Sequence, residues 1–203
     1  MTAAAGHGNC GAGGGPERMT DEEIIDRVRK GETRQFEQLV RRHKVEVYGM
    51  AARFVGRGPD AEDVAQEVFL KAFRSLAGFK GEAKFSTWLY RITFNLSTDW
   101  LRRTRRPGRK TAPLDDAREL SDGRVDLEAG LLDAEEKARV NRALDRLDER
   151  YRSVVVLLYY QKLAYEEIAA ILGVPVKTVE TRLYRARKIL REALREDGGG
   201  GRR

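Results

Sequence analysis

The sequence is poor in the residues that build disulfides and metal centres. Its 203 residues include one cysteine and two histidines. Because Cys10 is alone, an internal disulfide and a zinc site made of several thiolates are excluded. His7 lies three residues before Cys10 in a tail rich in glycine and alanine, and no two further ligands accompany them. We therefore expect no metal, no cofactor and a reduced compartment.

Long apolar runs and catalytic motifs are lacking too. No apolar stretch approaches the ~20 residues of a membrane span, and the N-terminus lacks the basic start and apolar stretch of a secretory signal. These absences predict a cytoplasmic chain with no direct membrane insertion. The sequence has no phosphate-binding glycine loop on a strand–helix unit, no paired histidines, and no Cys or Ser nucleophile beside a base. An enzyme with catalytic residues and a small-molecule substrate is disfavoured.

Charge is abundant, and its excess is basic. Charged residues make up 35% of the chain, with 39 Lys and Arg against 32 Asp and Glu. A net charge of +7 suits a nucleic-acid partner, but many soluble proteins are basic, so the position of the charge matters more. Basic residues gather over 102–110, whereas nine acidic residues dominate 111–136.

Apolar residues recur at helical spacing, and no segment alternates with period two over strand length. The sequence thus predicts an all-α fold of two small helical domains joined by a flexible charged linker. The expected divisions are a disordered tail (1–18), a first domain (19–106), the linker (107–132), a second domain (133–196) and a frayed tail (197–203). Two such domains have no strong reason to dock on each other. Met19, just before the first helix, is a candidate start codon.

Capping signals mark the expected helix starts in the first domain. Thr20 and Glu23 have the spacing of a capping box. The segment from Gly56 to Pro59 interrupts the helical pattern, and Asp60 is the expected N-cap of the following helix. Ser86 is the expected cap of a fourth helix that runs to about Arg105.

The most specific pattern lies in residues 165–190. Ile168, Ala169 and Leu172 share one face of a short helix, which Gly173 ends with a left-handed turn and Pro175 keeps from continuing. A second helix follows, with an apolar stripe made of Val179, Leu183, Ala186 and Leu190. This pattern predicts a helix-turn-helix.

The opposite arc of that second helix carries side chains that suit a DNA groove. They are Lys177, Glu180, Thr181, Tyr184, Arg185 and Lys188. Arg and Lys bind phosphates or guanine, Thr and Tyr make mixed contacts, and a carboxylate accepts from cytosine. A solvated helix face is the plainer interpretation of such an arc, but its place after a helix-turn-helix turn favours DNA reading.

A second polarised helix runs from Trp88 to Arg106. Its apolar stripe is Leu89, Ile92, Leu96 and Trp100. Its other face is Trp88, Arg91, Asn95, Asp99, Arg102 and Arg106. Aromatic and amide groups between arginines suit unstacked bases. Ordinary packing of Trp88 under the preceding loop and a solvated arginine-rich helix end are the alternatives.

Three motifs carry a family resemblance. They are DAEDVAQEVFLKAF (Asp60–Phe73), FSTWLYRI (Phe85–Ile92) followed by Asn95, and YEEIAAILG (Tyr165–Gly173) followed by RLYRAR (Arg182–Arg187). Their order and spacing resemble bacterial sigma factors of the extracytoplasmic-function (ECF) class. The similarity covers roughly residues 20–106 and 134–195.

The resemblance implies a factor that binds core RNA polymerase and promoter DNA. It also implies control by an anti-sigma factor that packs between the two domains. It assigns polymerase binding to Asp63, Gln66, Glu67 and Phe69. It assigns recognition and melting of the −10 element to Phe79, Lys84, Arg91, Asn95, Asp99 and Arg102, with Trp88 supporting the loop. It assigns the −35 element to the arc from Lys177 to Lys188.

The sequence departs from the family pattern at three positions. Asp148 replaces a frequent proline, Ala164 replaces a common serine N-cap, and Glu180 replaces a common basic contact residue. We therefore expect a less firmly held helix start after Ala164 and make no prediction of the promoter sequence. A helix-turn-helix activator or repressor is the alternative function, but it would need a sensory or dimerisation module in place of residues 20–106.

Overall fold

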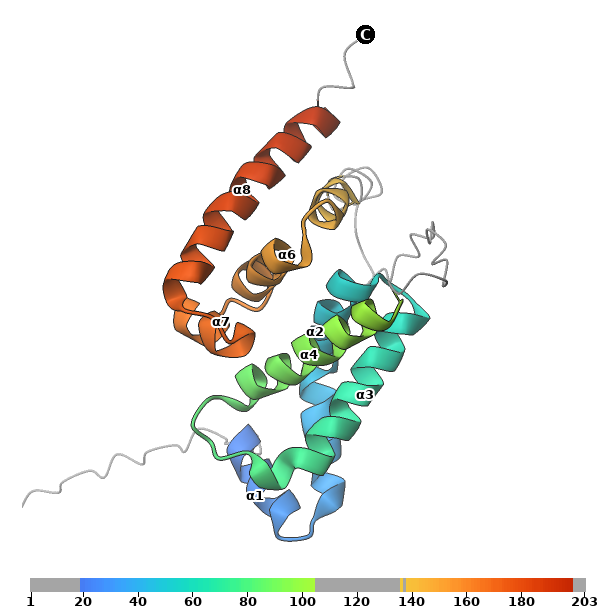
Figure 1. The fold of residues 1–203 in the computed structure, drawn as a ribbon. Helices are drawn as coiled ribbons and strands as arrows, with labels where there is room; N and C mark the ends of the chain where they lie inside the picture. Colours follow the sequence, from blue (N-terminus) through green and yellow to red (C-terminus); the bar gives the residue numbers. More distant parts are fainter. Residues whose placement is uncertain (1–18, 105–135, 137, 199–203) are drawn as a thin grey trace, which may run out of the picture.

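The computed structural model describes residues 19–104, 136 and 138–198. Helices α1 (Asp21–Arg29), α2 (Phe36–Val55), α3 (Pro59–Ser75) and α4 (Phe85–Thr104) form the N-terminal module (Figure 1). The C-terminal module contains a helix over 138–145, then α6 (Glu149–Val155), a π-helical turn (Val156–Tyr160), α7 (Tyr165–Leu172) and α8 (Val176–Gly198). Short 3-10 turns cover Thr33–Gln35 and Leu76–Gly78. This part of the chain holds no strand, so the predicted all-α class is confirmed.

Local capping rules explain where the first helices begin. The capping box predicted for α1 is confirmed, since Thr20 Oγ1 accepts from the Glu23 amide and Glu23 Oε2 accepts from the Thr20 amide. The two other predicted caps are wrong. Helix α3 already starts at Pro59, so Asp60 lies in its first turn, and α4 starts at Phe85, which puts Ser86 inside the helix. Proline is favoured at a first helical position, and Gly58 before it has a φ of 112° that suits glycine.

The N-terminal module packs α2, α3 and α4 around one apolar core, with α1 across one end (Figure 1). Its most buried side chains include Ile24, Leu39, Val47, Val68 and Leu89. The second module packs α6 and α7 against α8 around Val154, Leu157, Ile168, Val179 and Leu183.

The two modules also pack against each other, which corrects the expectation that they would not dock. Helix α4 contacts α7, and α2 contacts the π-helical turn. Thr87, Tyr90, Phe94 and Leu101 lie on one stripe of α4, and the last three join an apolar cluster with residues of the second module. The sequence pattern assigned α4 one apolar stripe, but the helix has two, one for each module.

The predicted linker (107–132) and most of the predicted tails (1–18 and 197–203) lie outside the described residues. Among the helices that are described, none has the length and apolar character of a membrane span. The same residues contain no group of three or more side chains able to hold a metal ion.

Candidate nucleic-acid and polymerase interfaces

The turn between α7 and α8 has the geometry expected of a helix-turn-helix. Gly173 adopts the left-handed conformation with φ 64° and ψ 37°, and the Val174 amide donates to the Ala169 carbonyl at 3.1 Å. At the start of α7, Ala164 offers no side-chain cap, but its amide donates to Glu167 Oε2 at 2.9 Å. Glu167 therefore supplies half of a capping box. This hydrogen bond stabilises the start of α7, which we expected to be less firmly held because Ala164 replaces the serine common in the family.

Helix α8 is buried on one face and exposed on the other. Val179, Leu183 and Ala186 are at most 1% exposed, and Leu190 is half-buried. All six residues of the predicted DNA-reading arc are exposed, with Tyr184 at 73%. The apolar stripe predicted for α8 therefore faces the core, and the arc from Lys177 to Lys188 is free to meet a ligand.

A neighbouring arginine has a different position. Arg187 Nε donates to the Tyr159 hydroxyl at 2.9 Å, and this hydrogen bond is the main reason that the pKa of Arg187 is raised. The contact joins α8 to the π-helical turn. Sequence reasoning did not single out this pair, because Tyr159 lies 28 residues from Arg187 and outside the helix-turn-helix pattern.

Five of the seven residues predicted to act at the −10 element are exposed. They are Lys84, Arg91, Asn95, Asp99 and Arg102. The four on α4 lie on the same side of the helix, away from both of its apolar stripes. Arg102 Nη1 pairs with Asp99 Oδ1 at 3.1 Å, one turn apart.

The two aromatic candidates are not exposed in the same way. Trp88 is half-buried, and Phe79 is 6% exposed. The Phe79 ring lies 5.3 Å from the Trp88 ring and 5.8 Å from the Phe85 ring, measured between centroids. Both aromatic side chains thus pack beneath the loop that precedes α4. This arrangement agrees with a supporting position for Trp88, and it buries Phe79, which was predicted to act at the −10 element, beneath the same loop.

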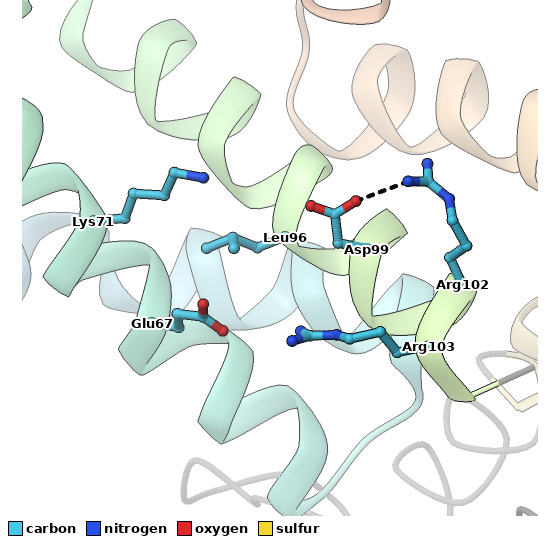
Figure 2. Close-up of a pocket in the computed structure, with 6 residues that line it drawn as sticks. All are labelled: Glu67, Lys71, Leu96, Asp99, Arg102 and Arg103. Atoms are coloured by element: carbon cyan, nitrogen blue, oxygen red, sulfur yellow. Dashed lines mark hydrogen bonds and ion pairs between the residues drawn. The ribbon is translucent and has the colours of Figure 1, made fainter. Parts of the chain in front are cut away.

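The predicted polymerase-binding residues lie along α3. Asp63, Gln66 and Glu67 are exposed, and Phe69 is half-buried against the core. Glu67 also lines a groove of about 350 Å³ between α3 and α4 (Figure 2). The groove is lined by Glu67, Lys71, Leu96, Asp99, Arg102 and Arg103. The predicted polymerase-binding surface and the predicted −10 surface therefore meet in one groove, with Glu67 on one wall and Asp99 on the other.

Comparisons with known proteins agree with this arrangement. The family model for Sigma-70 region 2 matches residues 39–107, and that for Sigma-70 region 4 matches residues 137–190. The RNA polymerase sigma-H factor of Pseudomonas aeruginosa is 37% identical over 181 residues, which cover 86% of this chain and 93% of that protein. The ECF RNA polymerase sigma-E factor of Escherichia coli K12 is 37% identical over 180 residues, covering 86% and 94%.

The chain belongs to the ECF sigma factors. Its family is one of transcription initiation factors, as its three sequence motifs predicted. Among solved structures, CnrH in complex with the cytosolic domain of CnrY has a TM-score of 0.65 and 32% identity, covering 87% of this sigma factor and 98% of that chain. The sigma factor RpoE of Bartonella quintana, solved with the anti-sigma factor NepR, has a TM-score of 0.64 at 24% identity, covers 79% and 96%, and shares the fold.

Proposed function

We propose that this sigma factor brings core RNA polymerase to promoters by reading two DNA elements with two different helices. In this proposal α8 reads the −35 element, and α4 with its preceding loop recognises and opens the −10 element. The observation that carries it is the α8 arc, which is wholly exposed on a helix whose opposite face is buried. A recognition helix needs such a division, because the face that enters the groove cannot also hold the core.

The proposed role of α4 rests on the kinds of side chain that its exposed face presents. Asn95 offers an amide to a base edge, and Arg91 and Arg102 offer charge to the backbone. Phe79 and Trp88 support the loop from below, so we assign them to holding its shape. The exposed part of α3 around Gln66 and Glu67 is proposed to bind the polymerase.

This function requires the two modules to separate. A −35 and a −10 element lie roughly 85 Å apart along B-DNA. In the present arrangement Thr87 of α4 and Glu167 of α7 are 2.9 Å apart. The segment 105–135 could span at most about 110 Å if fully extended, so it is long enough to let each module reach its own element.

We also propose that an anti-sigma factor controls this protein, as one binds the Bartonella relative. The surfaces that the modules now bury on each other would suit an amphipathic partner helix. Between the modules lies a groove of about 440 Å³, whose apolar lining is Phe94 of α4 with Leu172 and Val174 of the helix-turn-helix. Its polar lining is Asp148, Glu149, Arg150, Ser153 and Arg182, so an amphipathic helix suits it. A partner that covers both apolar surfaces at once gains avidity because the two modules are tethered. It would act by occluding α3 and α4, without chemical modification.

The test is transcription in vitro with the full chain and purified core polymerase. The template is a promoter library in which both elements are randomised. We expect the holoenzyme to enrich a defined sequence at both positions, and the chain without core polymerase to yield no transcript. Failure to associate with core polymerase in gel filtration would reject the proposal and favour a helix-turn-helix repressor.

A further inference from the structure

The loop between α3 and α4 is short, and a buried aromatic residue stands at each end. Residues 80–84 are all exposed, and they include Lys80 and Lys84. Phe79 before the loop and Phe85 after it are buried, and their rings meet at 5.8 Å and 84°. The conformation of this loop therefore depends on what holds Phe79 and Phe85.

Arg29, at the C-terminal end of α1, holds the Phe79 end. Its Nη2 donates to the Leu76 carbonyl at 3.1 Å and also to the Phe79 carbonyl. The Leu76 carbonyl also accepts from the Phe79 amide at 3.1 Å, and a positive charge near the C-terminal end of a helix is favourable. A guanidinium is rigid and planar, so one group that contacts both carbonyls fixes the direction in which the chain enters the loop.

Asp21, at the other end of α1, supports the Phe85 end. Its Oδ2 lies 2.6 Å from His43 Nε2, and its Oδ1 accepts from Arg42 Nη1 at 2.8 Å. The His43 ring packs edge to face on Phe85, with 5.5 Å between centroids. Asp21 therefore orients the His43 imidazole, which packs against Phe85, the first residue of α4.

The structure assigns a positioning function to α1, resting on the proposed role of the loop at the −10 element. We propose that α1 braces loop 80–84 in the conformation that recognises the −10 element, with Arg29 and Asp21 as its positioning residues. The nine residues of α1 span about 13 Å, which lets one rigid helix hold both ends of the loop. This helix lies outside the residues matched by the region 2 family model and carries none of the predicted DNA or polymerase contacts. A loop that is ordered before binding loses less conformational entropy when DNA binds.

The experiment measures sequence selectivity at each element separately. Holoenzymes with the unaltered chain, Arg29→Ala, Arg29→Lys and Arg27→Ala transcribe the library randomised at both elements. Arg27 is the matched control, because it lies on the same helix and is 50% exposed in a pair with Glu32. For Arg29→Ala we expect enrichment at −10 to fall roughly fivefold or more while enrichment at −35 is unchanged. Arg29→Lys should lose less of the −10 enrichment than Arg29→Ala, because the ammonium keeps the positive charge although it lacks the planar shape of the guanidinium.

Separate outcomes distinguish this inference from the proposed function. If the unaltered chain enriches no −10 sequence, the proposed function fails. If it does and Arg29→Ala retains the same enrichment, the brace is rejected. An equal fall at both elements would mean a general loss of folded protein and would also reject it. If circular dichroism shows that Arg29→Ala does not fold, Arg29→Lys and Asp21→Asn replace it, and their enrichment at −10 is compared with their enrichment at −35 in the same way.

Discussion

Thr87 Oγ1 in the first turn of α4 donates a hydrogen bond to Glu167 Oε1 in α7, across a distance of 2.9 Å and 80 residues of sequence. The other oxygen of the same carboxylate accepts from the Ala164 amide at the start of α7. Nearby, the Arg53 guanidinium lies 3.6 Å above the Tyr160 ring, which joins α2 to the π-helical turn. One contact thus joins α4 to α7 and the other joins α2 to the π-helical turn, and both link the two modules.

Thr87→Val combined with Tyr160→Ala should therefore open the free protein. The double change removes a hydrogen bond to a charged group and a cation–π contact, at a cost of about 2–4 kcal/mol for the two together. Small-angle X-ray scattering should give a larger radius of gyration than for the unaltered chain. Thr93→Val is the control, because its hydroxyl donates only to Leu89 within α4. An unchanged radius would show that the apolar surfaces alone hold the modules together.

Arg185→Ala and Lys177→Ala should weaken binding to the −35 element without unfolding the module, because both side chains are exposed. Loss of a base contact should cost about 1–3 kcal/mol, while loss of a phosphate contact should flatten the dependence of binding on salt. Leu183→Ala is the contrasting change. Its side chain is 1% exposed, so a cavity should destabilise the fold by roughly 2–5 kcal/mol. Chemical denaturation and DNA titration at several salt concentrations measure the two effects, and the reverse pattern would mean that α8 faces the other way.

Glu67→Lys should weaken association with core polymerase while leaving the N-terminal module folded. Glu67 is exposed on α3, so a reversed charge changes the surface and not the core. Glu37→Lys provides the control, since Glu37 is 65% exposed on α2 and outside the predicted interface. Gel filtration of each variant with core polymerase gives the measurement. Full holoenzyme formation by Glu67→Lys would show that Glu67 is not part of the polymerase interface.

Asn95→Ala should impair promoter opening more than formation of the closed complex. Its amide is exposed beside Arg91 and Arg102, where it can hold an extruded base. Permanganate footprinting should show less reactivity on a duplex promoter and near-normal reactivity on one with a pre-melted bubble. Equal losses on both templates would point to base recognition in addition to opening.

The stability of the chain should fall at alkaline pH through Tyr90. Burial, and to a smaller extent the charge of Glu46, raise the pKa of Tyr90 to about 12. An unfolded tyrosine has a pKa near 10, so the folded state favours the neutral phenol. Its stabilisation should be complete below pH ~10 and be lost as the pH rises toward ~12. Urea unfolding of Tyr90→Phe at several pH values should show a weaker pH dependence than the unaltered chain.

Much of this molecule follows from the sequence by itself. Gly173 and Pro175 lie between two apolar stripes, and this local pattern was enough to predict the helix-turn-helix and the exposed arc of α8. Helical periodicity and capping chemistry act over a few residues, which is why the Thr20–Glu23 capping box was also predicted. The family followed from three motifs whose order and spacing can be read along the chain.

Only the tertiary structure decided which side chains meet across long separations. The sequence pattern placed the N-caps of α3 and α4 at Asp60 and Ser86, but these helices begin at Pro59 and Phe85. Periodicity reports that a face is apolar but not what covers it, so the second stripe of α4 and the packing of the two modules were missed. For the same reason, the burial of Phe79 and the reach of Arg29 to the loop before α4 depend on helices that meet only when the chain folds.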